Sequence, residues 1–177
     1  MAHRALTGVL LVGGASTRFG SPKALARVGG ATLAERAWRL LGEACSDRIA
    51  VGKLADGLEL PFDLVDDGSD VRAPLAGLVA GLRAARTEVA VVIPVDMPLL
   101  DAAAVCALGQ ACREAAVSPT GPLPGAYAKT ALPLLEDALA RGELRLRDLV
   151  ARLDAAIVDL DESLLANVNE PRDLDRL

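Results

Sequence analysis

The residues best suited to chemistry lie near the N-terminus, in a glycine-rich stretch that also carries two cations. A short apolar run, Leu6 to Val12, is followed at once by Gly13 and Gly14. Paired glycines let backbone N–H groups come close to a ligand, and successive N–H groups that turn the same way form an anion-binding hollow. Arg18 and Lys23 follow; arginine can add a two-pronged phosphate contact and lysine a compact positive charge. The stretch therefore predicts a polyphosphate site at the end of a strand.

Carboxylates that follow two later apolar runs are candidates for metal and nucleotide binding. The strongest apolar run is Val89 to Ile93, and Asp96 follows it after Pro94 and Val95. Mg²⁺ prefers hard oxygen ligands and typically uses one or two carboxylates together with phosphates. Asp66 and Asp67 follow a weaker run, and Asp70 is close enough to be confused with them. An ordinary turn at Asp96 and a solvated acidic turn at 66–70 are the structural alternatives.

The scarcity of histidine and the scatter of the cysteines exclude several kinds of active site. The only histidine is His3, ahead of the first predicted strand. This excludes a Ser-His-Asp triad, a Cys-His pair and a multi-histidine metal site. Cys45, Cys106 and Cys112 form neither a disulfide framework nor a zinc pattern. Chemistry must then depend on carboxylates, cations, amides and backbone groups. Transfer to a phosphate meets this limit, because a phosphate is already an anion and needs no strong base.

Length, charge and composition bound the class of protein. The chain has 177 residues, which suits a single domain over 1–177. Hydrophobic residues make up 52%, yet no apolar run is long enough to cross a bilayer. A net charge of −5 and an aromatic content of 2% speak against a nucleic-acid partner. We expect a cytoplasmic protein with reduced thiols, without a membrane partner or a cleaved signal peptide.

Apolar β-branched runs alternate with amphipathic segments along the whole chain. The predicted strands are Leu6–Val12, Arg48–Val51, Phe62–Val65, Val89–Ile93, Ala115–Ser118, Gly125–Ala128 and Ala156–Leu160. The predicted helices are Ala31–Ala44, Pro74–Leu82, Asp101–Cys112, Ala131–Arg141, Leu146–Leu153 and a short one after Pro171. This order predicts an α/β fold, a three-layer αβα sandwich around a mostly parallel sheet. Since ligands bind beyond the carboxyl ends of parallel strands, the glycine loop and both acidic sites are expected at one edge.

Four motifs together resemble the MobA-like NTP transferases, the group that includes the molybdenum cofactor guanylyltransferases. The stretch 10–23 is similar to their N-terminal signature, roughly Leu-Ala-Gly-Gly-x-x-x-Arg-Met-Gly-x-x-Lys, with Val12 and Phe19 in place of Ala and Met. Segments that resemble Gly-Pro-Leu-Ala-Gly, Asp-x-Pro and Asn-x-Asn-Thr-Pro follow in the family's order, at 73–77, 96–98 and 167–171.

Three features depart from the family pattern. Ala73 stands in place of the glycine before the proline, and Gly52 stands where an asparagine often contacts the nucleotide. The segment 115–127 is shorter than the usual strand and loop near the second substrate. The second departure bears on guanine selection, and the third on the identity of the acceptor.

The resemblance implies a Rossmann-like fold of the nucleotide-diphospho-sugar transferase type and Mg²⁺-dependent transfer of GMP from GTP. The implied acceptor is a phosphorylated small molecule, the molybdopterin form of the molybdenum cofactor. The implied nucleotide-binding residues are Leu11, Val12, Gly13, Gly14, Arg18, Lys23, Gly52, Asp67 and Asp96. The implied catalytic residues are Arg18, Lys23 and Asp96, and the implied metal ligands are Asp96 and Asn169. Asn167 is an alternative to Asn169, which is also a good N-cap for the terminal helix.

Other functions stay open on the sequence alone. The same chemistry could use CTP, or act on another phosphorylated metabolite. A nucleotide-binding regulator without catalysis would not need both Lys23 and Asp96, which are present. A dinucleotide-binding dehydrogenase is disfavoured because the Gly-x-Gly-x-x-Gly fingerprint is absent, and a P-loop is disfavoured because no Gly-Lys-Ser/Thr follows the glycines.

Overall fold

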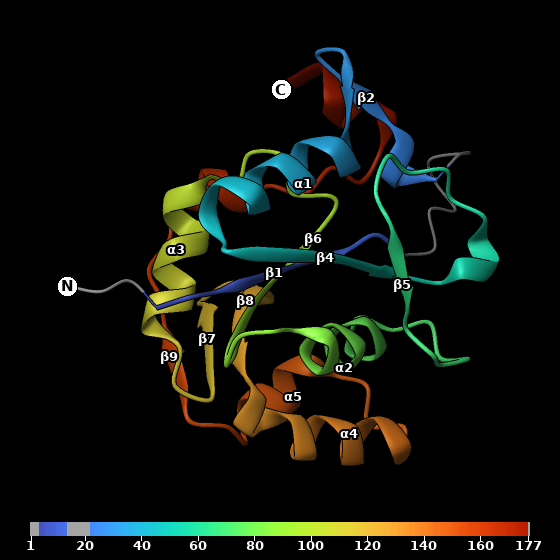
Figure 1. Cartoon of the computed structure of the whole chain (residues 1–177). Helices are drawn as coiled ribbons and strands as arrows, with labels where there is room; N and C mark the ends of the chain where they lie inside the picture. Colours follow the sequence, from blue (N-terminus) through green and yellow to red (C-terminus); the bar gives the residue numbers. More distant parts are fainter. Residues whose placement is uncertain (1–3, 14–21, 177) are drawn as a thin grey trace.

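The centre of the molecule is a seven-stranded sheet (Figure 1), seen in a computed structural model that describes residues 4–13 and 22–176. The strand order is β5-β4-β1-β6-β8-β7-β9. β8 runs antiparallel to both of its neighbours, and the other neighbouring strands are parallel. The strands are β1 (Thr7–Leu11), β4 (Asp47–Gly52), β5 (Leu64–Asp66), β6 (Val89–Pro94), β7 (Ala115–Ser118), β8 (Gly121–Ala128) and β9 (Ala155–Ile157). The predicted mostly parallel sheet is confirmed.

Helices cover both faces of this sheet, as a three-layer sandwich requires. The helices are α1 (Leu33–Ala44), α2 (Pro74–Ala84), α3 (Ala102–Ala111), α4 (Leu132–Ala140) and α5 (Leu146–Val150). Figure 1 shows α1 on one side of the sheet and α2, α4 and α5 on the other. Each layer has its own apolar cluster, one that includes Leu41 and Leu108 and one that includes Leu78 and Leu135. None of the helices among the described residues is long and apolar enough to cross a membrane.

The central strands are apolar at nearly every position because both faces are covered. In β6 the side chains alternate between the two clusters, with Val91 and Ile93 in one and Val92 in the other. β1 does the same with Val9 and Leu10. Unbroken apolar strands of this kind are typical of buried parallel sheets, and their carboxyl ends bring Gly13 and Asp96 to the same cavity.

The starts of the first three predicted helices are confirmed to within two residues, and each has a cap or a proline that the sequence contains. At α1, Thr32 Oγ1 accepts the Glu35 N–H at 3.1 Å, and Glu35 Oε2 accepts the Thr32 N–H at 2.7 Å. Such a reciprocal capping box satisfies two N–H groups that a helix start would otherwise leave unpaired. At α3, Asp101 Oδ1 accepts the Ala104 N–H at 2.8 Å, and Pro74 occupies the first turn of α2.

Several predicted boundaries are wrong by a few residues, and the shift at Phe62 goes with a tertiary contact. Phe62 is not in a strand, because its ring stacks on Trp38 of α1 with centroids 4.3 Å apart, and β5 starts only at Leu64. The Arg48 guanidinium lies over the same indole, 4.5 Å from its centroid.

A small ribbon of β2 (Arg27–Val28) and β3 (Ala31–Thr32) precedes α1 and was not predicted. β8 starts four residues before the predicted strand, and β9 ends at Ile157. Short 3-10 turns occupy Lys23–Leu25, Leu54–Asp56, Lys129–Ala131, Glu162–Leu165 and Pro171–Arg176.

A tight contact between α2 and β1 supports the strand that carries the glycine loop. A Cβ added at Gly81 would lie 2.5 Å from Val9 Cγ1. We expect Gly81→Val to lower the free energy of unfolding by about 2 kcal/mol, because overpacking a filled core displaces its neighbours. Chemical denaturation measures this, with Ala84→Val at an exposed position of the same helix as the control. Equal stability of the two variants would contradict the prediction.

Candidate functional site

A cavity of about 330 Å³ opens at the edge of the sheet where β1, β4 and β6 end. Its wall combines backbone at glycines, apolar side chains and two pairs of opposite charges. The lining residues are Leu11, Gly13, Val51, Gly52, Lys53, Asp56, Asp67, Arg72, Ala73, Pro74, Gly77, Pro94, Asp96 and Leu123. Five of the predicted site residues, namely Leu11, Gly13, Gly52, Asp67 and Asp96, are therefore brought together here. Gly14 and Arg18 lie outside the described residues.

One wall of the cavity consists of closely approaching backbone. Val12 N–H donates to the Val51 carbonyl at 3.0 Å and so extends the pairing of β1 with β4. A Cβ added at Gly13 would lie 3.9 Å from Gly52 Cα, and one added at Gly52 would lie 2.9 Å from Val12 Cγ2. The γ-methyl of Val12 thus takes the space that a side chain at position 52 would need.

Lys23 and Asp96 form an ion pair at the cavity, with Lys23 Nζ 3.0 Å from Asp96 Oδ2. Their side chains keep 17% and 25% of their surface exposed, so a ligand can reach both. Asp96 is anchored through its backbone, because its carbonyl accepts the Val168 N–H at 2.8 Å. The residue before it donates its N–H to the Leu11 carbonyl at 3.1 Å. These bonds hold the carboxylate beside the end of β1.

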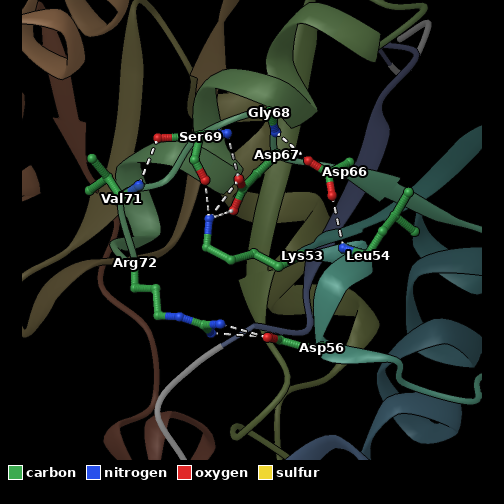
Figure 2. A network of polar contacts seen from close by, with 9 residues as sticks. All are labelled: Lys53, Leu54, Asp56, Asp66, Asp67, Gly68, Ser69, Val71 and Arg72. Carbon is green, nitrogen blue, oxygen red and sulfur yellow. Dashed lines mark hydrogen bonds and ion pairs between the residues drawn. The ribbon is translucent and has the colours of Figure 1, made fainter.

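A second ion pair, between Lys53 and Asp67, also lines the cavity (Figure 2). Lys53 Nζ lies 2.9 Å from Asp67 Oδ1 and 3.1 Å from Oδ2, and it also donates to the Ser69 carbonyl. Asp67 Oδ1 accepts the Ser69 N–H at 3.0 Å. Lys53 was missed from the sequence, although a lysine directly after the β4 glycine was a usable signal, because β4 and β5 are neighbours and end together.

The structure separates Asp67 from its acidic neighbours. Both carboxylate oxygens of Asp66 accept backbone N–H groups, from Leu54 and Gly68, each at 2.8 Å. These bonds hold the pKa of Asp66 below its ordinary value of 3.8 and explain its place in the turn. Neither Asp66 nor Asp70 lines the cavity, whereas Asp67 does. Figure 2 shows the Asp66 carboxylate bonded to the Leu54 and Gly68 N–H groups, whereas the Asp67 carboxylate is bonded to Lys53.

The C-terminal motif reaches the site edge through its backbone. Val168 is buried and bonded to Asp96, while Asn167 and Asn169 on either side of it are exposed and do not line the cavity. The N–H groups of Asn169 and Glu170 both donate to Asp173 Oδ2 at 2.9 Å. A carboxylate inside the final 3-10 turn therefore fixes this turn, in place of the predicted Asn169 cap. Metal binding by Asn169 stays a prediction.

Comparisons with known proteins give the chain its family. Residues 8–157 match the model of the MobA-like NTP transferase domain. A probable molybdenum cofactor guanylyltransferase of Chloroflexus aggregans is 33% identical over 97% of this chain and 93% of its own length. A molybdenum cofactor guanylyltransferase of Burkholderia ambifaria is 33% identical over 96% and 93%.

A solved structure shows the same fold. Molybdopterin-guanine dinucleotide biosynthesis protein A of Archaeoglobus fulgidus superposes with a TM-score of 0.79 at 23% identity, over 96% of this chain and 95% of that one. The predicted nucleotidyltransferase type of α/β fold is thereby confirmed. The chain belongs to the MobA-like NTP transferase family and is a nucleotidyltransferase.

Proposed function

We propose that the protein transfers GMP from GTP to the phosphate of the molybdopterin form of the molybdenum cofactor, with Mg²⁺ as cofactor and pyrophosphate as the second product. The observation that supports this most is one cavity lined by glycine backbone, Asp96 and Asp67, with Lys23 paired to Asp96. The names of the relatives supply the donor and the acceptor.

The two ends of the cavity suit the two ends of a nucleotide, its phosphates and its base. At one end, Lys23 Nζ and the backbone of Gly13 suit phosphate oxygens, and Arg18 in the same stretch of sequence would add a second cation. At the other end, Asp67 is an acceptor for N–H groups of a base. The phosphates would then lie at the carboxyl ends of β1 and β6, where ligands bind in open α/β sheets.

The donor groups suit Mg²⁺ that is shared with a bound triphosphate. Asp96 supplies one carboxylate at the cavity, and the described ranges 4–13 and 22–176 contain no cluster of three acidic, histidine or cysteine side chains that could hold a metal by themselves. Mg²⁺ commonly keeps waters and takes phosphates as ligands beside one or two carboxylates, so this set fits. Asp96 would hold the ion, which neutralises phosphate charge when bound.

The transfer itself needs orientation and charge neutralisation. An oxygen of the acceptor phosphate attacks the α-phosphorus of GTP in line and forms a P–O bond. The bond from the α-phosphorus to the bridging α–β oxygen breaks, and pyrophosphate leaves with that electron pair. The Lys23 ammonium stabilises the charge that grows on this leaving group. No proton has to be removed from an acceptor that is already an anion.

Thermal unfolding with GTP, CTP, ATP and UTP, each with and without Mg²⁺, tests the donor. A ligand at 100 times its Kd stabilises the native state by about 2.7 kcal/mol. We expect a Mg²⁺-dependent stabilisation with GTP, and pyrophosphate release from GTP once molybdopterin cofactor is added. A preference for CTP would replace the donor and keep the chemistry. No stabilisation by any triphosphate would contradict the proposed nucleotide site.

A further inference from the structure

Two ion pairs join the same two segments at the base end of the cavity (Figure 2). Lys53 pairs with Asp67, and Arg72 pairs with Asp56 through two bonds of 2.7 and 3.1 Å. The first pair is nearly buried, with side chains 13% and 9% exposed, whereas the Arg72 side chain is 57% exposed. Removal of water strengthens an ion pair and makes an unpaired charge costly, so the inner pair has the larger influence on the site.

The Lys53 ammonium has no donor left for a ligand. Its three N–H groups match three acceptors, the two Asp67 oxygens and the Ser69 carbonyl. Because Nζ spans both carboxylate oxygens, it fixes the plane of the Asp67 carboxylate. Lys53 therefore acts on a nucleotide through Asp67 and cannot offer a bond to a base carbonyl without giving one up.

Asp67 keeps acceptor capacity on one oxygen. Oδ1 accepts bonds from Lys53 Nζ and from the Ser69 N–H, which fill its two lone-pair positions. Oδ2 accepts one bond, from Lys53 Nζ, among the contacts of the described residues. The base end of the cavity thus offers an anionic acceptor and no ammonium donor, a pattern that favours a base with N–H groups on its recognition edge.

We propose that Lys53 is a positioning residue that holds Asp67 Oδ2 for an N–H group of guanine and so sets the preference for GTP over ATP. This inference rests on the proposed use of GTP. Guanine presents both a ring N–H and a 2-amino group, whereas adenine presents an acceptor nitrogen where guanine has its ring N–H. A site built around a buried hydrogen-bonding group discriminates strongly against a ligand that lacks the partner. Loss of Lys53 should leave the Asp67 carboxylate in place but wrongly oriented.

Direct binding of GTP, ITP and ATP with Mg²⁺, measured by calorimetry, tests the inference. We expect Lys53→Met to weaken GTP binding about tenfold, the loss of one charge-assisted hydrogen bond, and ATP binding less than about twofold. ITP, which lacks the 2-amino group, shows whether this group or the ring N–H is the partner. In an Asp67→Asn background, Lys53→Met should change the GTP/ATP ratio no further, because the two residues act as one unit.

Two controls separate positioning from a general loss of structure. Lys129→Met removes a lysine at the opposite end of the sheet, beside the start of β6, and should leave all affinities unchanged. Arg83→Met breaks an exposed ion pair with Glu136 away from the cavity and should preserve the GTP/ATP ratio. Should Lys53→Met fail to fold, Lys53→Gln keeps a polar side chain and is expected to lower the ratio in the same direction.

The outcomes distinguish this inference from the proposed function. Equal weakening of GTP and ATP by Lys53→Met, or an undiminished effect in the Asp67→Asn background, would overturn the positioning role. A wild-type protein without preference for GTP over ATP would overturn it too. If the wild type prefers GTP, Lys53→Met removes the preference, and yet no GMP reaches molybdopterin, then the role of Lys53 stands and the proposed acceptor is wrong.

Discussion

An Asp96→Asn protein is expected to lose about a thousandfold in kcat/KM for nucleotidyl transfer, roughly 4 kcal/mol of transition-state stabilisation. Asp96 supplies a carboxylate directly at the cavity, and no acidic cluster in residues 4–13 and 22–176 could replace it as a metal ligand. Asparagine keeps the size of the side chain and removes its charge. Its backbone bond with Val168 does not involve the side chain, so the fold should be retained.

Initial rates of pyrophosphate release over a range of GTP concentrations below KM, at saturating Mg²⁺ and a fixed acceptor concentration, measure this loss in kcat/KM. Asp159→Asn, at an exposed carboxylate outside the cavity, is the control and should keep wild-type turnover. Binding of GTP without Mg²⁺ should change little or improve in Asp96→Asn, because a negative charge near the phosphates has been removed. Full transfer activity of the variant would exclude Asp96 from the chemistry.

A Lys23→Met protein is expected to change nucleotide and metal binding in opposite directions. Nucleotide affinity should fall about a hundredfold, the loss of charge-assisted phosphate bonds worth about 3 kcal/mol. Metal affinity of the nucleotide-free protein should rise, because Lys23 Nζ lies 3.0 Å from Asp96 Oδ2 and neutralises the carboxylate that a cation would use. In the wild type, we expect a bound triphosphate to take the lysine as its partner and to release the carboxylate for the metal.

Mn²⁺ titration followed by electron paramagnetic resonance reads the metal directly, without any turnover. Lys129→Met is the matched control, a lysine lost far from Asp96, and should bind Mn²⁺ as the wild type does. If Lys23→Met lowers the affinity for both the nucleotide and Mn²⁺, Lys23 supports metal binding, and the proposed competition between Lys23 and the metal for Asp96 is wrong. If the variant changes neither affinity, Lys23 has no role in the site.

The predictable parts of the fold are those that depend on residues close together in the sequence. β6 is apolar at every position because both of its faces are covered, and Thr32 with Glu35 has the spacing of a capping box. Phe62 shows the opposite case, because its ring prefers the distant Trp38 to a strand position. β8 pairs with β6 through a register that no local pattern contains, and its two prolines conceal its first half.

The motifs of the candidate site could be found in the sequence, but the hydrogen-bond and ion-pair partners of its side chains could not. The sequence places Asp66 and Asp67 at one turn, but only the structure shows that the first bonds to backbone and the second to Lys53. The same holds for Gly52, because only the structure shows that the Val12 side chain lies where a Cβ at position 52 would be. Each of these outcomes depends on a partner more than ten residues away.

The stack of Phe62 on Trp38 has a practical consequence for spectroscopy. Trp38 is the only tryptophan of the chain, so its fluorescence comes from one place, the contact between α1 and the segment that leads into β5. Emission therefore reports whether this segment is docked against the helix. The protein carries an intrinsic optical probe of the scaffold just ahead of Asp67, and it can be read in every variant without a label.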